Sequence, residues 1–187
     1  MRLRFAIVPL LALLAIGNAP HSYVLDTGAS AVTAKVAFFG LASKTATFPS
    51  MVGQVTIVPD RPQEALVDVT LDARALTAPD AVTLRRLKGE KFFWVEKYPT
   101  VRFIGRRLEM AGPASGTVHG KLTARGVTRD EQLSVTFDIP PDKAAPGKAV
   151  TINGEMQIDR RNYGMTAYNF IVGKMVTIRL RARMTPQ

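Results

Sequence analysis

Apolar and polar residues alternate along most of this chain, a pattern typical of β-strands with one buried and one solvated face. The clearest case is the segment 176–183, where Val176, Ile178 and Leu180 alternate with polar residues. Because such strands are joined by short links, they predict an all-β fold, either an eight-stranded antiparallel barrel or a sandwich. The predicted strands cover residues 31–38, 42–58 (interrupted at Pro49), 67–72, 100–103, 117–124, 131–139, 152–158 and 176–183.

The period of the apolar residues changes between 81 and 87, where their spacing predicts a short helix. Asp80 precedes this helix and can accept hydrogen bonds from its first backbone N–H groups, and Gly89 ends it. The segment 90–95 can form a second helical turn. Pro99 then returns the chain to extended backbone. The sequence therefore predicts one helical insert within a β domain.

Three consecutive aromatic residues, Phe92, Phe93 and Trp94, follow this helix. Aromatic side chains carry the largest apolar area, so the cluster is either an anchor of the core or the lining of an apolar cavity. Strand alternation leaves both interpretations open, because residues of a packed core and of a cavity wall obey the same alternation.

Charge and composition narrow the chemistry. The chain has 187 residues, a formal net charge of +10, no cysteine and two histidines, His21 and His119. It offers no disulfide, no thiol nucleophile and no usual metal site, and we expect neither catalytic residues nor a cofactor. Arg179, Arg181 and Arg183 line one face of the last strand. We interpret them as a solvated outer face rather than a nucleic-acid site, with transient contact with an anionic membrane surface as the alternative.

The N-terminus has the order of a secretory signal peptide: Arg2 and Arg4, an apolar run from Phe5 to Ile16, then small residues. We expect a signal peptide over residues 1–19, cleaved after 17 or 19, and one domain over 20–187. The run is too short for a standard transmembrane helix. These features predict an exported protein.

Four segments resemble the YceI family of bacterial periplasmic proteins. They occur in the family's order and at its spacing, and they extend over nearly the whole predicted domain. The segments are 23–26 (YVLD), 92–103 (FFWVEKYPTVRF), 122–128 (LTARGVT) and 158–165 (IDRRNYGM).

The resemblance implies a lipocalin-like, eight-stranded antiparallel β-barrel with a helix near its mouth. It also implies an apolar lumen that holds a long isoprenoid-type lipid, such as a polyprenyl phosphate or a quinone, for sequestration or transport and without catalysis. A filled barrel acting as a non-catalytic interaction or stress-related protein is the alternative. The sequence does not specify the oligomeric state, and a homodimer is one of the alternatives. The ligand-binding residues that we predict are Val36, Phe38, Val69, Leu71, Phe92, Phe93, Trp94, Phe103, Val135, Phe137, Met156, Tyr163, Met165 and Ile178.

The chain also departs from the family pattern. Ala29 and Phe38 stand where relatives usually have histidine, and the helix reads Leu84-Arg85-Arg86-Leu87 in place of an Arg-Asp pair. Phe38 is expected to make the lumen more apolar or narrower.

Overall fold

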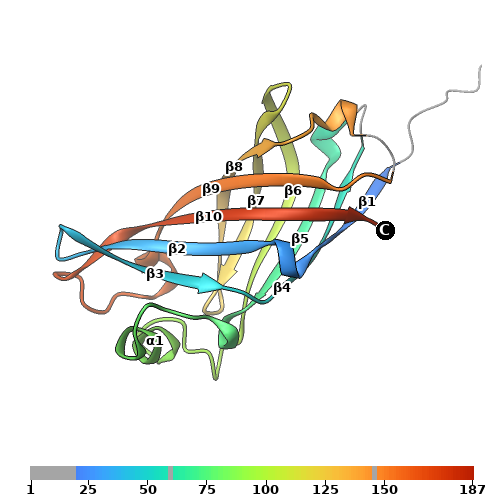
Figure 1. Ribbon diagram of the computed structural model, residues 1–187. Coiled ribbons are helices and arrows are strands. Elements are labelled where there is room, and N and C mark those ends of the chain that lie inside the picture. The colour runs from blue at the N-terminus through green and yellow to red at the C-terminus, as the bar shows by residue number, and fades with distance from the viewer. Residues whose placement is uncertain (1–19, 59–60, 145–146) are drawn as a thin grey trace, which may run out of the picture.

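The computed structural model describes residues 20–58, 61–144 and 147–187, and in this part the chain forms an antiparallel β-barrel (Figure 1). The predicted signal peptide lies outside the described residues. The strands are β1 (His21–Leu25), β2 (Ala31–Phe38), β3 (Ala42–Phe48), β4 (Met51–Ile57), β5 (Leu66–Asp72), β6 (Thr100–Gly112), β7 (Ser115–Ala124), β8 (Val127–Phe137), β9 (Val150–Asp159) and β10 (Val172–Pro186). The helix is α1 (Ala81–Lys88), and short 3-10 turns cover Thr27–Ala29, Pro62–Glu64, Ala73–Ala75, Pro141–Lys143 and Arg160–Tyr163.

Ten strand segments fill eight positions in the wall. The hydrogen-bonded order is β1-β4-β5-β6-β7-β8-β9-β10-β2-β3, and β1 also pairs with β10, which closes the barrel. β1 and β2 are two halves of one wall strand, broken at the turn 27–29, and β3 and β4 are likewise broken at residues 49–50. The eight-stranded barrel expected from the sequence is therefore confirmed.

The wall is incomplete beside β3. β3 pairs with β2 along one edge, while its other edge makes only an isolated bridge from Thr47 to Thr77 within the described residues. α1 and the segment 89–99 lie beside this edge (Figure 1). They occupy the place where a sheet neighbour of β3 would continue the wall, so the helical insert covers the side of the barrel at one end.

Local sequence explains the boundaries of this insert. The Asp80 side chain accepts a hydrogen bond from the Thr83 backbone N–H at 2.8 Å, and Gly89 follows the last helical residue, as predicted. The second helical turn expected over 90–95 is wrong. This segment forms successive tight turns, in which Phe93 N donates to Leu87 O and Trp94 N donates to Gly89 O. Trp94 has φ of +49°, which continuous helix excludes.

Two predicted loops are shorter than the sequence suggested. The predicted strands 100–103 and 117–124 left residues 104–116 between them, whereas β6 and β7 extend to Gly112 and Ser115 and leave only residues 113–114. β7 and β8 are joined by Arg125 and Gly126 alone, both with positive φ, as tight hairpins require. The two-residue link keeps β7 and β8 in one continuous register, from the pair Ala124 and Val127 to the pair Ser115 and Thr136.

Candidate functional site

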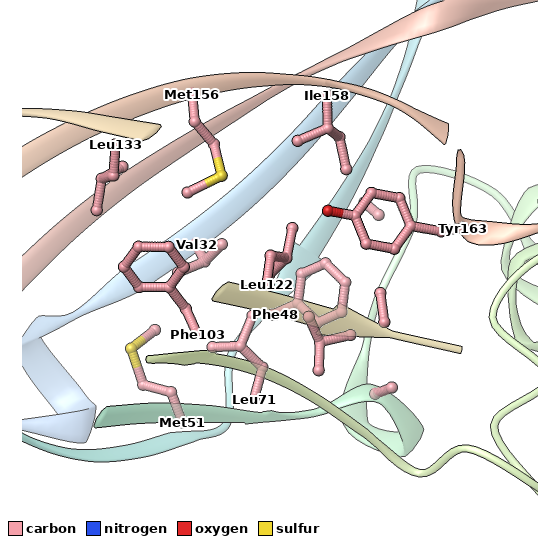
Figure 2. Packing of buried hydrophobic residues seen from close by; sticks show 14 of the residues in the cluster. Val32, Phe48, Met51, Leu71, Phe103, Leu122, Leu133, Met156, Ile158 and Tyr163 are labelled. Atoms are coloured by element: carbon pink, nitrogen blue, oxygen red, sulfur yellow. The ribbon is translucent and has the colours of Figure 1, made fainter. Parts of the chain in front are cut away.

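The barrel encloses an apolar cavity of about 200 Å³. Inward side chains from all ten strands line it, and Lys44, Thr45 and Arg160 are the only polar residues among the described residues that do so. Figure 2 shows Phe103, Met51 and Met156 directed into this interior from three different strands. An apolar cavity of about 150 Å³ is known to stay dry and to bind benzene, so this interior is suited to an apolar ligand.

A pair of glycines gives the Phe103 ring its room. Gly105 and Gly120 lie opposite each other in the β6–β7 register. A Cβ atom on Gly120 would come within 2.7 Å of Phe103 Cζ, and one on Gly105 within 3.3 Å of Phe103 Cε1. The Phe103 ring therefore lies over a patch of wall without side chains, between the strands and the cavity.

Most residues predicted to bind a ligand do line this cavity. Their contact with a ligand stays a prediction, whereas their position in the wall is a feature of the structure. The lining members are Val36, Val69, Leu71, Phe92, Phe93, Phe103, Val135, Phe137, Met156, Met165 and Ile178.

Three predicted residues lie elsewhere. Phe38 is at the end of β2, beyond the lining, where its ring packs edge-on against Phe39 with centroids 4.6 Å apart. Trp94 packs against Tyr98 and under the Lys97 ammonium group, outside the lining, because its positive φ turns it away from Phe92 and Phe93.

Tyr163 is the third. It is completely buried in the core cluster, and its hydroxyl donates a 2.7 Å hydrogen bond to Glu131 Oε1. Burial first, and the bond to Glu131 second, raise the pKa of Tyr163 far above its usual value. This side chain is therefore a structural link between the turn 160–163 and β8 rather than part of the cavity mouth.

The cavity reaches the surface between β3 and α1. Lys44 lines it and yet keeps 34% of its side chain exposed, and its Nζ forms a 2.8 Å ion pair with Asp80 at the start of α1. The hydrogen bond from Lys44, with those from Thr83, holds the pKa of Asp80 well below its usual range. Farther along β3, the Phe48 ring meets the Phe93 ring of the helical insert edge-on, with centroids 5.5 Å apart. We call this contact between β3 and the helical insert the mouth.

A second core cluster lies at the opposite end of the barrel, and its members come from segments that are distant in sequence. The cluster consists of Tyr23, Val55, Ile57, Ala144, Val150 and Met184. Three of these residues, Val55, Ile57 and Met184, also line the cavity.

Among the described residues, Arg160 is the one charged side chain buried against the cavity, with an exposed fraction of 2%. Its Nε donates to Gly173 O at 2.9 Å, and Nη2 donates to Val172 O at 2.9 Å and to Asn169 Oδ1 at 3.1 Å. Its Nη1 donates to the Met165 carbonyl. The guanidinium therefore fastens the loop between the turn 160–163 and β10.

The electrostatic setting of Arg160 is unusual. The adjacent carboxylate of Asp159 pairs with Arg161, at 2.5 Å, and not with Arg160. Burial lowers the pKa of the Arg160 guanidinium, although such a group stays cationic in proteins. A cation held by neutral carbonyl and amide oxygens thus contributes a positive potential to one side of an otherwise apolar chamber.

Sequence reasoning missed Arg160 and Lys44 as lining residues. A signal for Arg160 was present, because the inward parity of Met156 and Ile158 continues to position 160. The same signal was present for Lys44, because it shares the strand parity of Ala46 and Phe48, which also line the cavity.

We also searched the described residues for a metal site, a site at a histidine and a membrane-spanning helix. In that part of the chain, no group of three or more His, Asp and Glu side chains could hold a metal ion. His119 lies on the outer wall, with Nε2 3.2 Å from Glu109 Oε2. Of the helices that the structure describes, none has the length and apolar character needed to cross a membrane.

Solved structures share this architecture. The crystal structure of BcnA from Burkholderia cenocepacia matches with a TM-score of 0.76 and 22% identity, over 85% of this chain and 98% of that chain. A polyisoprenoid binding domain from Saccharophagus degradans matches with a TM-score of 0.65 and 15% identity, over 89% and 99% of the two chains. A YceI protein from Campylobacter jejuni matches with a TM-score of 0.63 and 19% identity, over 76% and 84%.

Sequence comparison leads to the same group. No curated protein matches the chain. The model of the YceI-like domain matches residues 23–184, which run from within β1 to within β10 and include the four segments that resemble the family. With a shared barrel and a match over the whole wall, the chain belongs to the YceI-like domain family.

Proposed function

We propose that this protein holds a long-chain, isoprenoid-type lipid in its barrel, for sequestration or transport in the periplasm after export through the N-terminal signal. The observation that supports this most directly is the cavity, which is apolar over nearly its whole wall and includes the partly exposed Lys44 among its lining residues. The family match and the polyisoprenoid binding domain among its structural relatives support the same ligand class.

Burial of the chain supplies the affinity in this proposal. Each methylene group removed from water contributes about 0.8 kcal/mol, so a long hydrocarbon gains steadily as it fills an apolar chamber. Four methionines line the cavity, and their unbranched side chains can repack around a branched ligand. They are Met51, Met156, Met165 and Met184.

The polar end of the lipid is best accommodated at the mouth. Lys44 is there, lines the cavity while about a third of its side chain stays exposed (34%), and can place a cation beside a phosphate or a quinone carbonyl. The lining includes no aspartate, glutamate or histidine among the described residues, so the proposal is for binding without catalysis.

Mass spectrometry of an organic extract from protein purified out of its native host tests the proposal. We expect one long-chain isoprenoid lipid in near-stoichiometric amount. An extract without lipid, from protein whose cavity also rejects added polyprenyl phosphate and quinone, would contradict it and favour a filled barrel with an interaction role.

Two substitutions sharpen this test. Phe103→Asp places an unpaired charge against the cavity and should abolish lipid retention or folding. Val52→Asp, on the exposed side of β4, is the matched control and should leave both unchanged. A stable Phe103→Asp protein that still carries lipid would show that this ring does not border the ligand.

A further inference from the structure

Large apolar side chains are exposed at one end of the barrel. Two loops there, the β2–β3 hairpin and the link before β10, carry Phe39, Leu41 and Phe170, which are 65%, 101% and 104% exposed. Both loops lie at the left of Figure 1, with α1 beneath them. Among the described residues away from this end, only Val52 and Leu66 have large apolar side chains that are more than half exposed.

The two loops form one surface. The Phe39 backbone N–H donates to Ile171 O at 2.8 Å, and Phe38 lies opposite Val172 in the β2–β10 register. Tyr168 anchors the second loop to the helical insert, because its ring stacks on Phe92 with centroids 6.1 Å apart. We call the exposed side chains of Phe39, Leu41 and Phe170 the tip.

The backbone conformation of these loops does not explain why they carry large apolar residues. Phe39 has φ of +52°, a conformation that favours glycine, asparagine or aspartate over a bulky aromatic residue. Three large apolar side chains in water, one of them at a strained position, lower the solubility of the free protein and add nothing to its core. Their position is better explained by an apolar environment that receives them.

The helical insert next to the second loop is rich in cations. The segment from 81 to 91 carries Arg85, Arg86, Lys88 and Lys91 against the single carboxylate of Glu90.

Two of these cations lie directly beside the second loop. The Arg86 guanidinium and the Lys91 ammonium group are 5.5 and 5.4 Å from the centre of the Tyr168 ring. Protruding apolar side chains with flanking cations fit the headgroup region of a bilayer that contains anionic lipids.

We propose that this end docks onto the surface of an anionic lipid bilayer, with Phe39, Leu41 and Phe170 inserted among the headgroups and acyl chains. The cavity lies directly behind the docking surface, since Val36 and Val172 line it and border the hairpin and the loop. The mouth at Lys44 is on the same side of the barrel. Docking would therefore bring the opening to the membrane.

This surface differs from the arginine stripe noted in the sequence. The stripe lies on β10, where Arg179 pairs with Glu155 at 2.7 Å and Arg183 lies 3.9 Å from Asp26. Carboxylates there already offset part of the positive charge. The structure thus favours the end of the barrel, and not its β10 wall, as the membrane contact.

Cosedimentation with phosphatidylcholine vesicles, with and without phosphatidylglycerol, tests the proposal. We expect salt-sensitive binding that requires phosphatidylglycerol. The double variant Leu41→Ser/Phe170→Ser should bind at least roughly tenfold more weakly, since it removes two inserting side chains. The matched control Val52→Ser/Leu66→Ser removes exposed apolar groups elsewhere and should bind like the wild type. All variants have the same N-terminus, so any contribution of the N-terminus to vesicle binding is the same in each of them.

A second pair of variants tests the charge. Arg86→Gln/Lys91→Gln should weaken binding to phosphatidylglycerol vesicles several-fold, whereas Arg179→Gln/Arg181→Gln should have little effect.

Absence of vesicle binding at low salt, or equal losses in the tip variant and its control, would overturn the proposal. The assay measures docking alone, so its outcome is separate from that of the lipid extraction. Unchanged urea midpoints confirm that each variant is folded.

Discussion

Replacement of Arg160 by methionine tests whether this buried cation holds the loop before β10 in place. The change keeps an apolar stem of similar length and removes all four hydrogen bonds that the guanidinium donates to residues 165–173. Two of its acceptors, the carbonyls of Met165 and Val172, belong to buried residues.

The expected magnitude is a balance of two effects. A hydrogen bond from a charged donor contributes about 1.5–3 kcal/mol, and a buried acceptor left without its donor costs about 1–3 kcal/mol. Against this, methionine avoids the burial of a cation that lacks a carboxylate partner, which costs several kcal/mol. We expect a net loss of about 2–4 kcal/mol in the free energy of unfolding. Arg160→Lys should lose a similar amount, because an ammonium group cannot reach acceptors on four residues.

Urea unfolding, followed by the fluorescence of Trp94, measures this loss, since Trp94 is the only tryptophan of the chain. Arg161→Met is the matched control: its side chain is 44% exposed and pairs with Asp159, so its effect should stay within about 0.5 kcal/mol. Amide exchange over 165–173 should accelerate in the Arg160→Met protein alone. Equal midpoints for both variants, with unchanged exchange, would refute the role assigned to Arg160.

Three further outcomes follow from particular contacts. Tyr163→Phe should lose about 1–2 kcal/mol of stability, because Glu131 loses its hydroxyl partner. The raised pKa of Tyr163 favours the folded state below pH 10, so the wild type should lose stability above pH 10 and the variant should show a smaller alkaline loss, by circular dichroism. The depressed pKa of Asp80 favours the fold above pH 3.8. As the pH falls below that value, protonation should free α1 from β3, seen as faster amide exchange in α1 before global unfolding; uniform exchange would contradict this. Gly120→Ala should cost about 1–3 kcal/mol, since its Cβ would lie 2.5 Å from a β6 carbonyl, while Gly28→Ala has room and should be neutral in urea melts.

The sizes of the inward side chains explain why the barrel keeps a cavity. Inward positions along the wall combine bulky rings with glycines, as at Phe103 with Gly105 and Gly120, so the wall is close-packed while the centre stays partly open. The filled interior that alternation equally allowed is thus replaced by a chamber of about 200 Å³.

Local features were predictable because they depend on near neighbours. Alternation identified the inward faces, for example Val69, Leu71 and Phe103, and Asp80 and Gly89 marked the ends of α1. These patterns follow from the period of two in a strand and from the unpaired backbone groups at helix ends. The order and spacing of four motifs added the family and, through it, the closed barrel.

Only the tertiary structure decided which inward residues border the cavity and which exposed apolar residues form a cluster on the surface. Phe38 and Phe103 have the same pattern in sequence, but β2 ends at Phe38 beyond the cavity, whereas β6 carries Phe103 across its middle. The tip is likewise a product of closure, which brings residues 39 and 170 together although 130 positions separate them. Alternation along one strand specifies a direction for each side chain, whereas cavity volume and surface clustering depend on the positions of all the strands at once.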